Sequence, residues 1–83
     1  MDSIYDALDI FNNASKIAFT QNDFELEARC EAEIGKLYNL ALKKESKAMT
    51  HFNNVVRLAM ALRPKDVTNN AWYREVQTTK EAI

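Results

Sequence analysis

The segment ALDIFNNASKIA at residues 7–18 returns as AMTHFNNVVRLA at residues 48–59, an offset of 41 positions. Five of the twelve positions are identical, and four more are conservative replacements. Outside these segments, Ala41 matches Ala82 at the same offset, and Ile34 matches Val76 after a shift of one residue. A fixed period indicates that the matching segments are one structural element used twice. We therefore predict an internal repeat of two units.

Both copies have the apolar period of an α-helix, with Ala7, Phe11, Ala14 and Ala18 spaced three or four residues apart in the first copy. The same period along the chain predicts four helices, at about residues 3–20, 23–43, 46–62 and 69–83. The second of these carries two apolar lines, which is typical of a helix packed on two sides. The sequence thus predicts a single all-α domain over residues 1–83.

Residues that typically begin or end helices support these boundaries. Pro64 cannot continue the third helix, and residues 65–68 are expected to form a connector. Residues 21–23 predict a turn, and Asn22 with Glu25 predicts a capping box at the start of the second helix. The turn at residues 42–46 has to be made without glycine or proline.

Composition agrees with an all-α fold and excludes several function classes. The 83 residues include one Gly and one Pro, the residues that hairpins and phosphate-binding loops need, so a β-rich fold or a Gly-rich nucleotide site is excluded. The net charge of −1 argues against a nucleic-acid partner. A single Cys forms no intramolecular disulfide, which favours a reducing compartment and a cytoplasmic location. No apolar run is long enough to span a membrane, and no signal peptide is expected.

The repeated pattern resembles the second helix of a tetratricopeptide repeat, whose signature is Ala-x3-Phe-x2-Ala. It occurs here as Ala7, Phe11 and Ala14 and again as Ala48, Phe52 and Val55. Other positions resemble the first helix of that repeat: Ile34, Gly35 and Tyr38 match its hallmark, and Trp72 matches the aromatic that opens the next one. In this family the small residue, here Gly35, lets the paired helix approach closely.

The period of 41 exceeds the usual value of about 34 residues. It is similar to the longer-helix class found in kinesin light chains and Leu-Gly-Asn adaptor proteins, echoed here by Asp23, Glu27 and Ala28. The resemblance implies antiparallel helix-turn-helix pairs in a right-handed solenoid, with about two repeats. By this resemblance the chain begins on a helix of the second type and ends on a helix of the first type, so its two repeats are not whole helix pairs. We therefore expect a fragment of a longer protein or an abbreviated solenoid. The turn at residues 42–46 is one residue longer than the family pattern.

Side chains that could carry chemistry are few. His51 and Cys30 are the only residues of their kinds, but Ile10 occupies the position of His51 in the other copy, and Cys30 lies on an apolar line. Both are interpreted as packing residues. One His and one Cys do not make a zinc site. We expect no catalysis, metal or cofactor.

Two sets of polar residues in the helices also need interpretation. The acidic residues of the second helix are predicted to form a solvated face; they are Glu25, Glu27, Glu31 and Glu33. The repeated Asn pairs, at residues 12–13 and 53–54, form either an exposed face inherited by duplication or hydrogen bonds to a neighbouring helix.

In tetratricopeptide arrays the first helices line a concave groove that holds peptides. Carried over by position, the resemblance places eight residues there: Arg29, Glu33, Lys36, Asn39, Asn70, Tyr73, Arg74 and Gln77. Together they imply a mixed-charge, slightly basic strip suited to a short acidic or amphipathic peptide. The sub-family that clamps the C-terminal carboxylate of chaperones is disfavoured, because this chain has Glu33 in place of Asn and Asn70 in place of Lys.

Two functions follow as expectations. The first is a protein-interaction module that holds a peptide or helix of another protein. The second is a structural segment that self-associates, because the first helix lacks a preceding partner and leaves Tyr5, Ile10 or Phe19 unburied.

Overall fold

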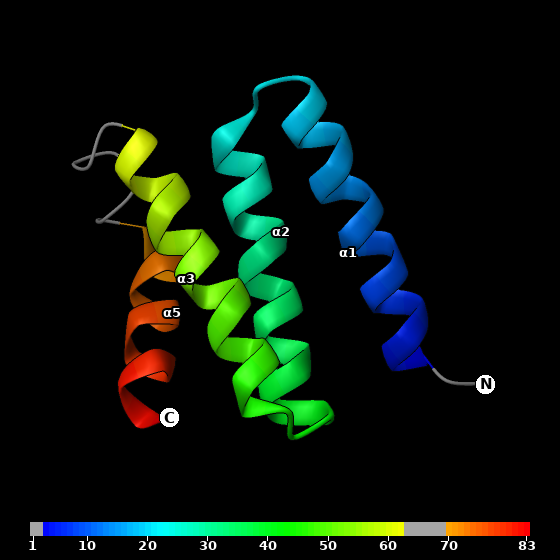
Figure 1. Cartoon of the computed structure of the whole chain (residues 1–83), viewed down its shortest axis with the longest axis vertical. Coiled ribbons are helices and arrows are strands. Elements are labelled where there is room, and N and C mark those ends of the chain that lie inside the picture. The colour runs from blue at the N-terminus through cyan, green and yellow to red at the C-terminus, as the bar shows by residue number, and fades with distance from the viewer. Residues whose placement is uncertain (1–2, 63–69) are drawn as a thin grey trace.

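The computed structural model describes residues 3–62 and 70–83 (Figure 1). That part of the chain contains four α-helices and no strand, which confirms the all-α prediction and the number of helices. The elements are α1 (Ser3–Thr20), α2 (Phe24–Lys36) with its π-helical continuation η1 (Leu37–Ala41), α3 (Glu45–Ala61) and α5 (Ala71–Ala82). Pro64, the expected connector at residues 65–68 and Asn69 lie outside the described residues.

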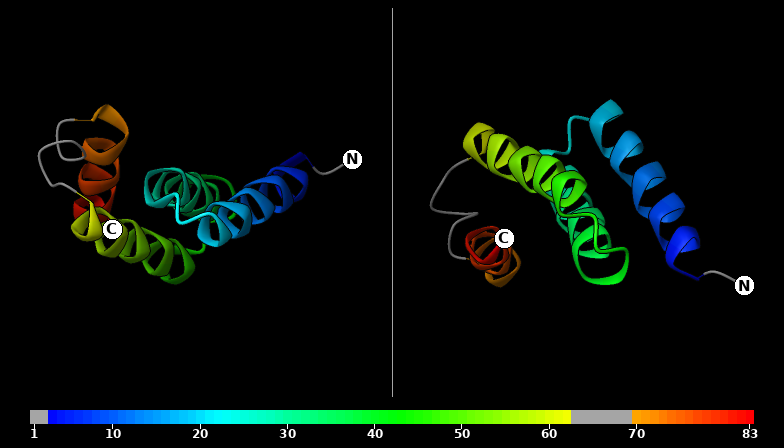
Figure 2. Two further views of the ribbon diagram at one scale, coloured as in Figure 1. Left: turned by 90° about the horizontal axis from the view of Figure 1, so that it is seen from above. Right: turned by 60° about the horizontal axis from the view of Figure 1, so that its bottom comes forward.

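Helix α2 is the centre of the domain, as its two apolar lines predict. It packs against α1 on one side and α3 on the other, while α5 packs on both α2 and α3. Figure 2 shows α1 and α5 on opposite sides of the α2–α3 pair. None of the described helices is both long and apolar enough to cross a membrane.

The turn between α1 and α2 is made by Asn22 and Asp23. Asn22 adopts a left-handed conformation with φ of 57°, and the backbone N–H of Asp23 donates to the carbonyl of Ala18 at 2.8 Å. The carboxylate of Asp23 then accepts from the N–H of Leu26 at 3.2 Å. The cap of α2 is therefore Asp23, and the predicted capping box on Asn22 is wrong, because Asn22 closes the preceding helix instead.

The turn between η1 and α3 is made without glycine by Lys43, whose φ is 56°. A lysine in this left-handed region costs about 1 kcal/mol. The N–H of Leu42 donates to the carbonyl of Leu37 at 3.1 Å, a π-type bond, and the N–H of Lys44 donates to Tyr38 at 2.7 Å. Because each π-type bond encloses one more residue than an α-helical bond, η1 accommodates the extra residue expected in this turn.

The core is built on α3. Phe52 is fully buried in a cluster with Ala32, Ala48, Val55 and Val76, which come from α2, α3 and α5. Tyr38 and Trp72 pack against this cluster from outside. The ring of Phe52 lies directly against Gly35, which confirms the close approach expected there.

The two copies of the repeat differ in burial. Leu58 on α3 is 6 % exposed, but its counterpart on α1, Ile17, is 56 % exposed. The main neighbours of α1 are α2 and η1, whereas α3 is covered by both α2 and α5. Ile17 therefore lies on a side of α1 that none of the other described helices covers, although its counterpart in the repeat is buried. Tyr5, Ile10 and Phe19 are exposed, as predicted.

Candidate functional site

A cavity of about 330 Å³, here called the α2 groove, lies on the face of α2 between α1 and α5. Six residues line it: Phe11, Leu26, Arg29, Cys30, Glu33 and Trp72. Phe11 comes from α1 and Trp72 from α5, while the other four come from α2. These four follow one another at helical spacing and so share one face of α2. The groove thus joins side chains from three helices.

The floor of the α2 groove is apolar. Cys30 is buried, Phe11 and Trp72 are half-buried, and Leu26 is exposed. Burial raises the pKa of the Cys30 thiol, and the nearby carboxylates of Glu31 and Glu33 raise it further. A protonated, buried thiol is a poor nucleophile. Cys30 therefore contributes packing to the groove rather than reactivity.

The edge of the α2 groove is charged. The guanidinium of Arg29 lies over the ring of Trp72, 6.0 Å from its centre. The Nζ of Lys36 donates to Oε1 of Glu33 at 3.0 Å and to Oε1 of Glu75 at 3.1 Å. Burial by itself lowers the pKa of Lys36, but the hydrogen bonds to Glu33 and Glu75 outweigh it, so the pKa is raised. Lys36 is thus a charged side chain already bonded by two carboxylates.

Among the eight residues predicted for the site, Arg29 and Glu33 line the cavity, and Lys36 bonds Glu33 beside it. Asn39 lies half-buried on η1, beyond the cavity lining. The prediction is wrong for Tyr73, which is buried in a cluster with Ala59 and packed by Leu62 and Trp72.

The other three residues predicted on α5 do not line the cavity either. Gln77 is half-buried and donates from Nε2 to the hydroxyl of Tyr73 at 2.8 Å. Asn70 occupies the N-cap position, where its carbonyl accepts from the N–H groups of Tyr73 and Arg74. Arg74 is exposed and absent from the lining. Thus none of the four residues predicted on α5 lines the α2 groove.

A shift of one residue explains the error on α5. The offset of 42 that pairs Ile34 with Val76 pairs two fully buried residues. The same offset pairs Glu33 with Glu75, which both bond Lys36. Since one residue turns a side chain by about 100° around the helix, using the offset of 41 moved the predicted positions away from the groove. The Ile34–Val76 match was the sequence signal for the correct register.

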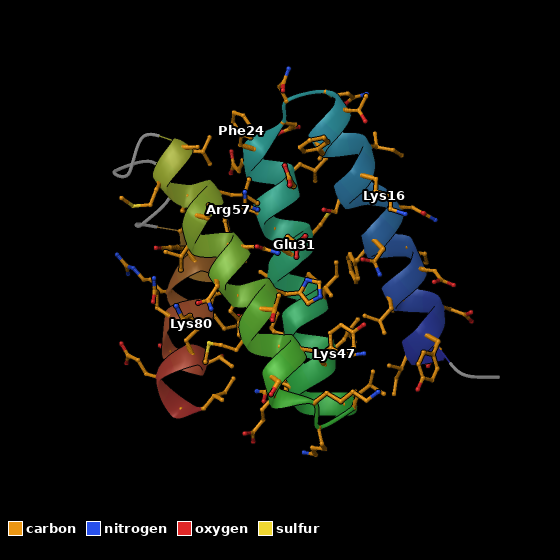
Figure 3. All side chains as sticks on the ribbon, in the orientation of Figure 1. Lys16, Phe24, Glu31, Lys47, Arg57 and Lys80 are labelled. Carbon is orange, nitrogen blue, oxygen red and sulfur yellow. The ribbon has the colours of Figure 1, made fainter. Side chains whose placement is uncertain are left out.

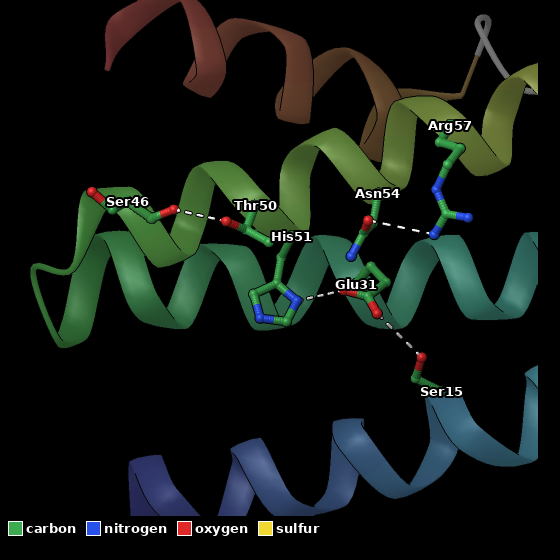
Figure 4. Close-up of polar contacts among 7 residues, drawn as sticks. All are labelled: Ser15, Glu31, Ser46, Thr50, His51, Asn54 and Arg57. Carbon is green, nitrogen blue, oxygen red and sulfur yellow. Dashed lines mark hydrogen bonds and ion pairs between the residues drawn. The ribbon is translucent and has the colours of Figure 1, made fainter.

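A second set of polar contacts lies on the other side of α2, centred on Glu31. Its carboxylate accepts from Oγ of Ser15 on α1 at 3.5 Å and bonds Nδ1 of His51 on α3 at 2.5 Å. The ring of His51 stacks on Tyr38, with the ring centres 5.4 Å apart. Figure 4 shows Ser15 and His51 both pointing toward Glu31, so this one carboxylate links three helices.

This set of residues does not have the geometry of a nucleophilic site. In such a site the hydroxyl bonds a base, and a third group orients that base. Here the hydroxyl of Ser15 and the ring of His51 each bond the carboxylate of Glu31 instead of each other. The contacts therefore connect helices and do not activate the serine.

Two of the glutamates predicted to face solvent do not. Glu27 is 8 % exposed, and its Oε1 has no hydrogen-bond partner among the described residues. Burial raises the pKa of Glu27, and repulsion from Glu31 adds to this while Arg57 opposes it. Glu31 lies between α3 and α1 in Figure 3, whereas Lys16 of α1 points away to solvent. The prediction failed because α2 is covered on two sides and few of its positions reach water.

The repeated Asn pairs do not behave alike. Asn13 and Asn53 are exposed, whereas Asn12 and Asn54 are half-buried. The amide oxygen of Asn54 accepts from Nη2 of Arg57 at 3.4 Å, a contact within α3. This contact stays within one helix and does not join α3 to a neighbouring helix.

Comparison of the chain with protein families, with curated proteins and with solved structures finds no match. Within residues 3–62 and 70–83, no three His, Cys, Asp or Glu side chains are grouped so as to hold a metal ion. The geometry of the α2 groove is therefore the basis for assigning a function.

Proposed function

We propose that this chain is a protein-interaction module of the tetratricopeptide type, which holds a peptide or helix of a partner protein and performs no catalysis. The observation that carries the proposal is the α2 groove, a cavity with the apolar side chains of Phe11, Leu26 and Trp72 and with charged residues at its edge. An apolar centre inside a polar rim is the arrangement by which proteins anchor a partner's side chain.

Three further features support the proposal. The internal repeat and the family resemblance describe helix pairs that commonly serve as binding scaffolds. The cavity of about 330 Å³ is of a size that accepts one or two side chains. We place the module in the cytoplasm, a reducing compartment in which Cys30 remains a thiol.

Selection from a random peptide library tests the proposal. Peptides are enriched on the full chain and then compared on two variants, Leu26→Asp and Met60→Asp. Leu26 lines the groove, whereas Met60 is an exposed apolar residue of α3 outside its lining, so it is a matched control. Leu26→Asp puts a charge on the apolar floor and should abolish binding of the selected peptides, while Met60→Asp should leave it unchanged.

Either of two results would contradict the proposal. One is the absence of any enriched peptide. The other is a set of peptides that bind the wild type and Leu26→Asp equally well, because the α2 groove would then not be the binding site.

Self-association is a second candidate, and the exposed side of α1 favours it. Ile10 and Ile17 are exposed, although their counterparts His51 and Leu58 are half-buried and buried on α3. An apolar helix face that is covered in one copy of a repeat and open in the other is a candidate interface.

Light scattering on the chain tests this second candidate. We expect a dimer or larger species that forms with rising concentration and is lost in Ile17→Glu but kept in the control Met60→Glu. A monomer at about 1 mM chain would count against self-association, since interfaces of useful affinity are populated at that concentration.

A further inference from the structure

The charges around the α2 groove are unequal. At one end, Asp23 and Glu25 line a hollow that adjoins the groove and shares Leu26 and Arg29 with it. At the other end are the bonded residues Glu33, Lys36 and Glu75. Among the residues that line these two hollows or bond Lys36, the carboxylates of Asp23, Glu25, Glu33 and Glu75 outnumber the positive charges of Arg29 and Lys36. This set of residues is therefore acidic, whereas the strip predicted from the sequence, which includes Arg74, is slightly basic.

The more exposed member of each ion pair is the carboxylate. The side chain of Lys36 is 23 % exposed, whereas those of Glu33 and Glu75 are 43 % and 56 % exposed. A ligand that enters the groove from solvent therefore meets the oxygens of Glu33 and Glu75 before the ammonium of Lys36. Lys36 in turn has little capacity for a new anion, because two carboxylates already bond it.

The contribution of Asp23 is smaller than its charge implies. Its carboxylate caps α2 and accepts from the N–H of Leu26, so the positive end of the helix dipole offsets it. Glu25 is exposed in the same first turn. The excess negative charge that a ligand meets therefore comes from Glu25, Glu33 and Glu75.

From these observations we infer that the α2 groove recognises a basic peptide segment, in which one apolar side chain is flanked by lysine or arginine. The apolar side chain fills the space between Phe11, Leu26 and Trp72, and the flanking cations pair with Glu33 and Glu75. Opposite charge at the edge of an apolar site selects the partner and speeds its encounter. This inference rests on the proposed interaction function and specifies the partner's chemistry.

Trp72 is the chain's single tryptophan and lines the groove, so its fluorescence reports binding directly. Three Trp-free synthetic peptides of about twelve residues are titrated into the full chain. The first has a central leucine flanked by lysines, the second has glutamate in place of each lysine, and the third keeps the lysines but has a central alanine. We expect the first peptide to bind about tenfold or more tightly than either of the others.

Salt and two charge variants identify the source of the preference. The affinity of the leucine–lysine peptide should fall when salt is raised from about 0.05 M to about 0.5 M, because exposed charges are screened. The double variant Glu33→Gln with Glu75→Gln should lose most of the preference for lysine over glutamate. Asp9→Asn removes an exposed carboxylate of α1 that does not line the groove, and it should leave the preference unchanged.

The possible results of these titrations distinguish a failure of this inference from a failure of the proposed function. Equal or tighter binding of the glutamate peptide would overturn the inference, although peptide binding in the groove would still stand. Equal binding of the alanine–lysine peptide, or a lysine preference unaffected by the double variant, would also overturn it, because the groove would not be the source of selectivity. If no peptide at about 1 mM changes the fluorescence of Trp72, the result contradicts both this inference and the proposed function.

Discussion

Gly35 of α2 lies so close to Phe52 of α3 that a Cβ atom at position 35 would stand 2.5 Å from Cε1 and 2.7 Å from Cδ1 of the ring. The ring is fully buried and belongs to the main core cluster. A shift of the ring would therefore disturb the side chains of this cluster. The chain's single glycine therefore lies where the ring of Phe52 from α3 packs directly against the backbone of α2.

We predict that Gly35→Ala destabilises the protein by about 1–3 kcal/mol, because overpacking outweighs the helix propensity that alanine adds. Urea denaturation followed by circular dichroism measures this change. The double variant Gly35→Ala with Phe52→Leu should show less than the sum of the two single losses, since the smaller side chain makes room for the methyl group. A more stable Gly35→Ala protein would show that α2 and α3 can separate at no cost.

The bond between Glu31 and His51 should stabilise the folded protein, so that replacing either residue lowers the free energy of unfolding. Glu31→Ala should cost about 1–3 kcal/mol, because it removes the partner of a half-buried ring nitrogen. Ser15→Ala should cost less than about 1 kcal/mol, since its bond of 3.5 Å is long. A double-mutant cycle between Glu31→Ala and His51→Ala should give a coupling of about 1 kcal/mol. Strictly additive losses would mean that the two residues act independently.

The buried carboxyl of Glu27 should make stability depend on pH. Burial, followed by repulsion from Glu31, raises its pKa above the ordinary value of 4.5, so the ionised form opposes folding. Its stabilising contribution is complete below pH 4.5 and is lost as the pH rises through the higher pKa of the folded state. Glu27→Gln should therefore be more stable than the wild type at pH 7, by on the order of 1 kcal/mol, and the advantage should shrink toward pH 4.

Thermal unfolding at both pH values measures the effect of Glu27→Gln. The control is Glu25→Gln, an exposed position on the same helix, which should change stability by less than about 0.5 kcal/mol. A less stable Glu27→Gln protein at pH 7 would instead show that attraction between Glu27 and Arg57 dominates.

Cys30 should react slowly with thiol reagents in the folded protein. It is buried, and burial together with Glu31 and Glu33 raises its pKa above the ordinary value of 9.0, so little thiolate is present at pH 8. We expect labelling by an aromatic disulfide reagent to be about a hundredfold slower in buffer than in denaturant. The matched control moves the thiol to an exposed site of α3, in Cys30→Ser with Thr50→Cys. Equal rates for the two folded proteins would contradict the buried position of Cys30.

The helices could be predicted because their signals are local. Residues 3–20 were predicted to form the first helix, and α1 spans Ser3–Thr20. The third helix was predicted at residues 46–62, and α3 spans Glu45–Ala61. Apolar period and turn residues act within a few positions, so the sequence shows them directly. The π-helical η1 was missed because it differs from an α-helix by one residue per turn and has the same apolar pattern.

The candidate site was predicted on α2 and missed on α5. Arg29, Glu33 and Lys36 lie near one another because helical spacing alone places them on one face. Glu75 and Trp72 join them through the packing of α5 on α2, and an error of one residue in register is enough to hide this. The burial of Glu27 was also missed, because helix glutamates normally face solvent and the cover comes from neighbouring helices.

Residue order alone determines the repeat, the all-α class and the role of Gly35, because the apolar period and the size of each side chain follow directly from the sequence. The difference in burial between Leu58 and Ile17 does not follow from residue order, because these equivalent residues have different neighbours in the folded protein. The sign of charge around the α2 groove is likewise a tertiary property. Lys36 belongs to α2, but one of the two carboxylates that engage it comes from α5. Burial and charge pairing depend on segments distant in sequence, and packing alone brings those segments together.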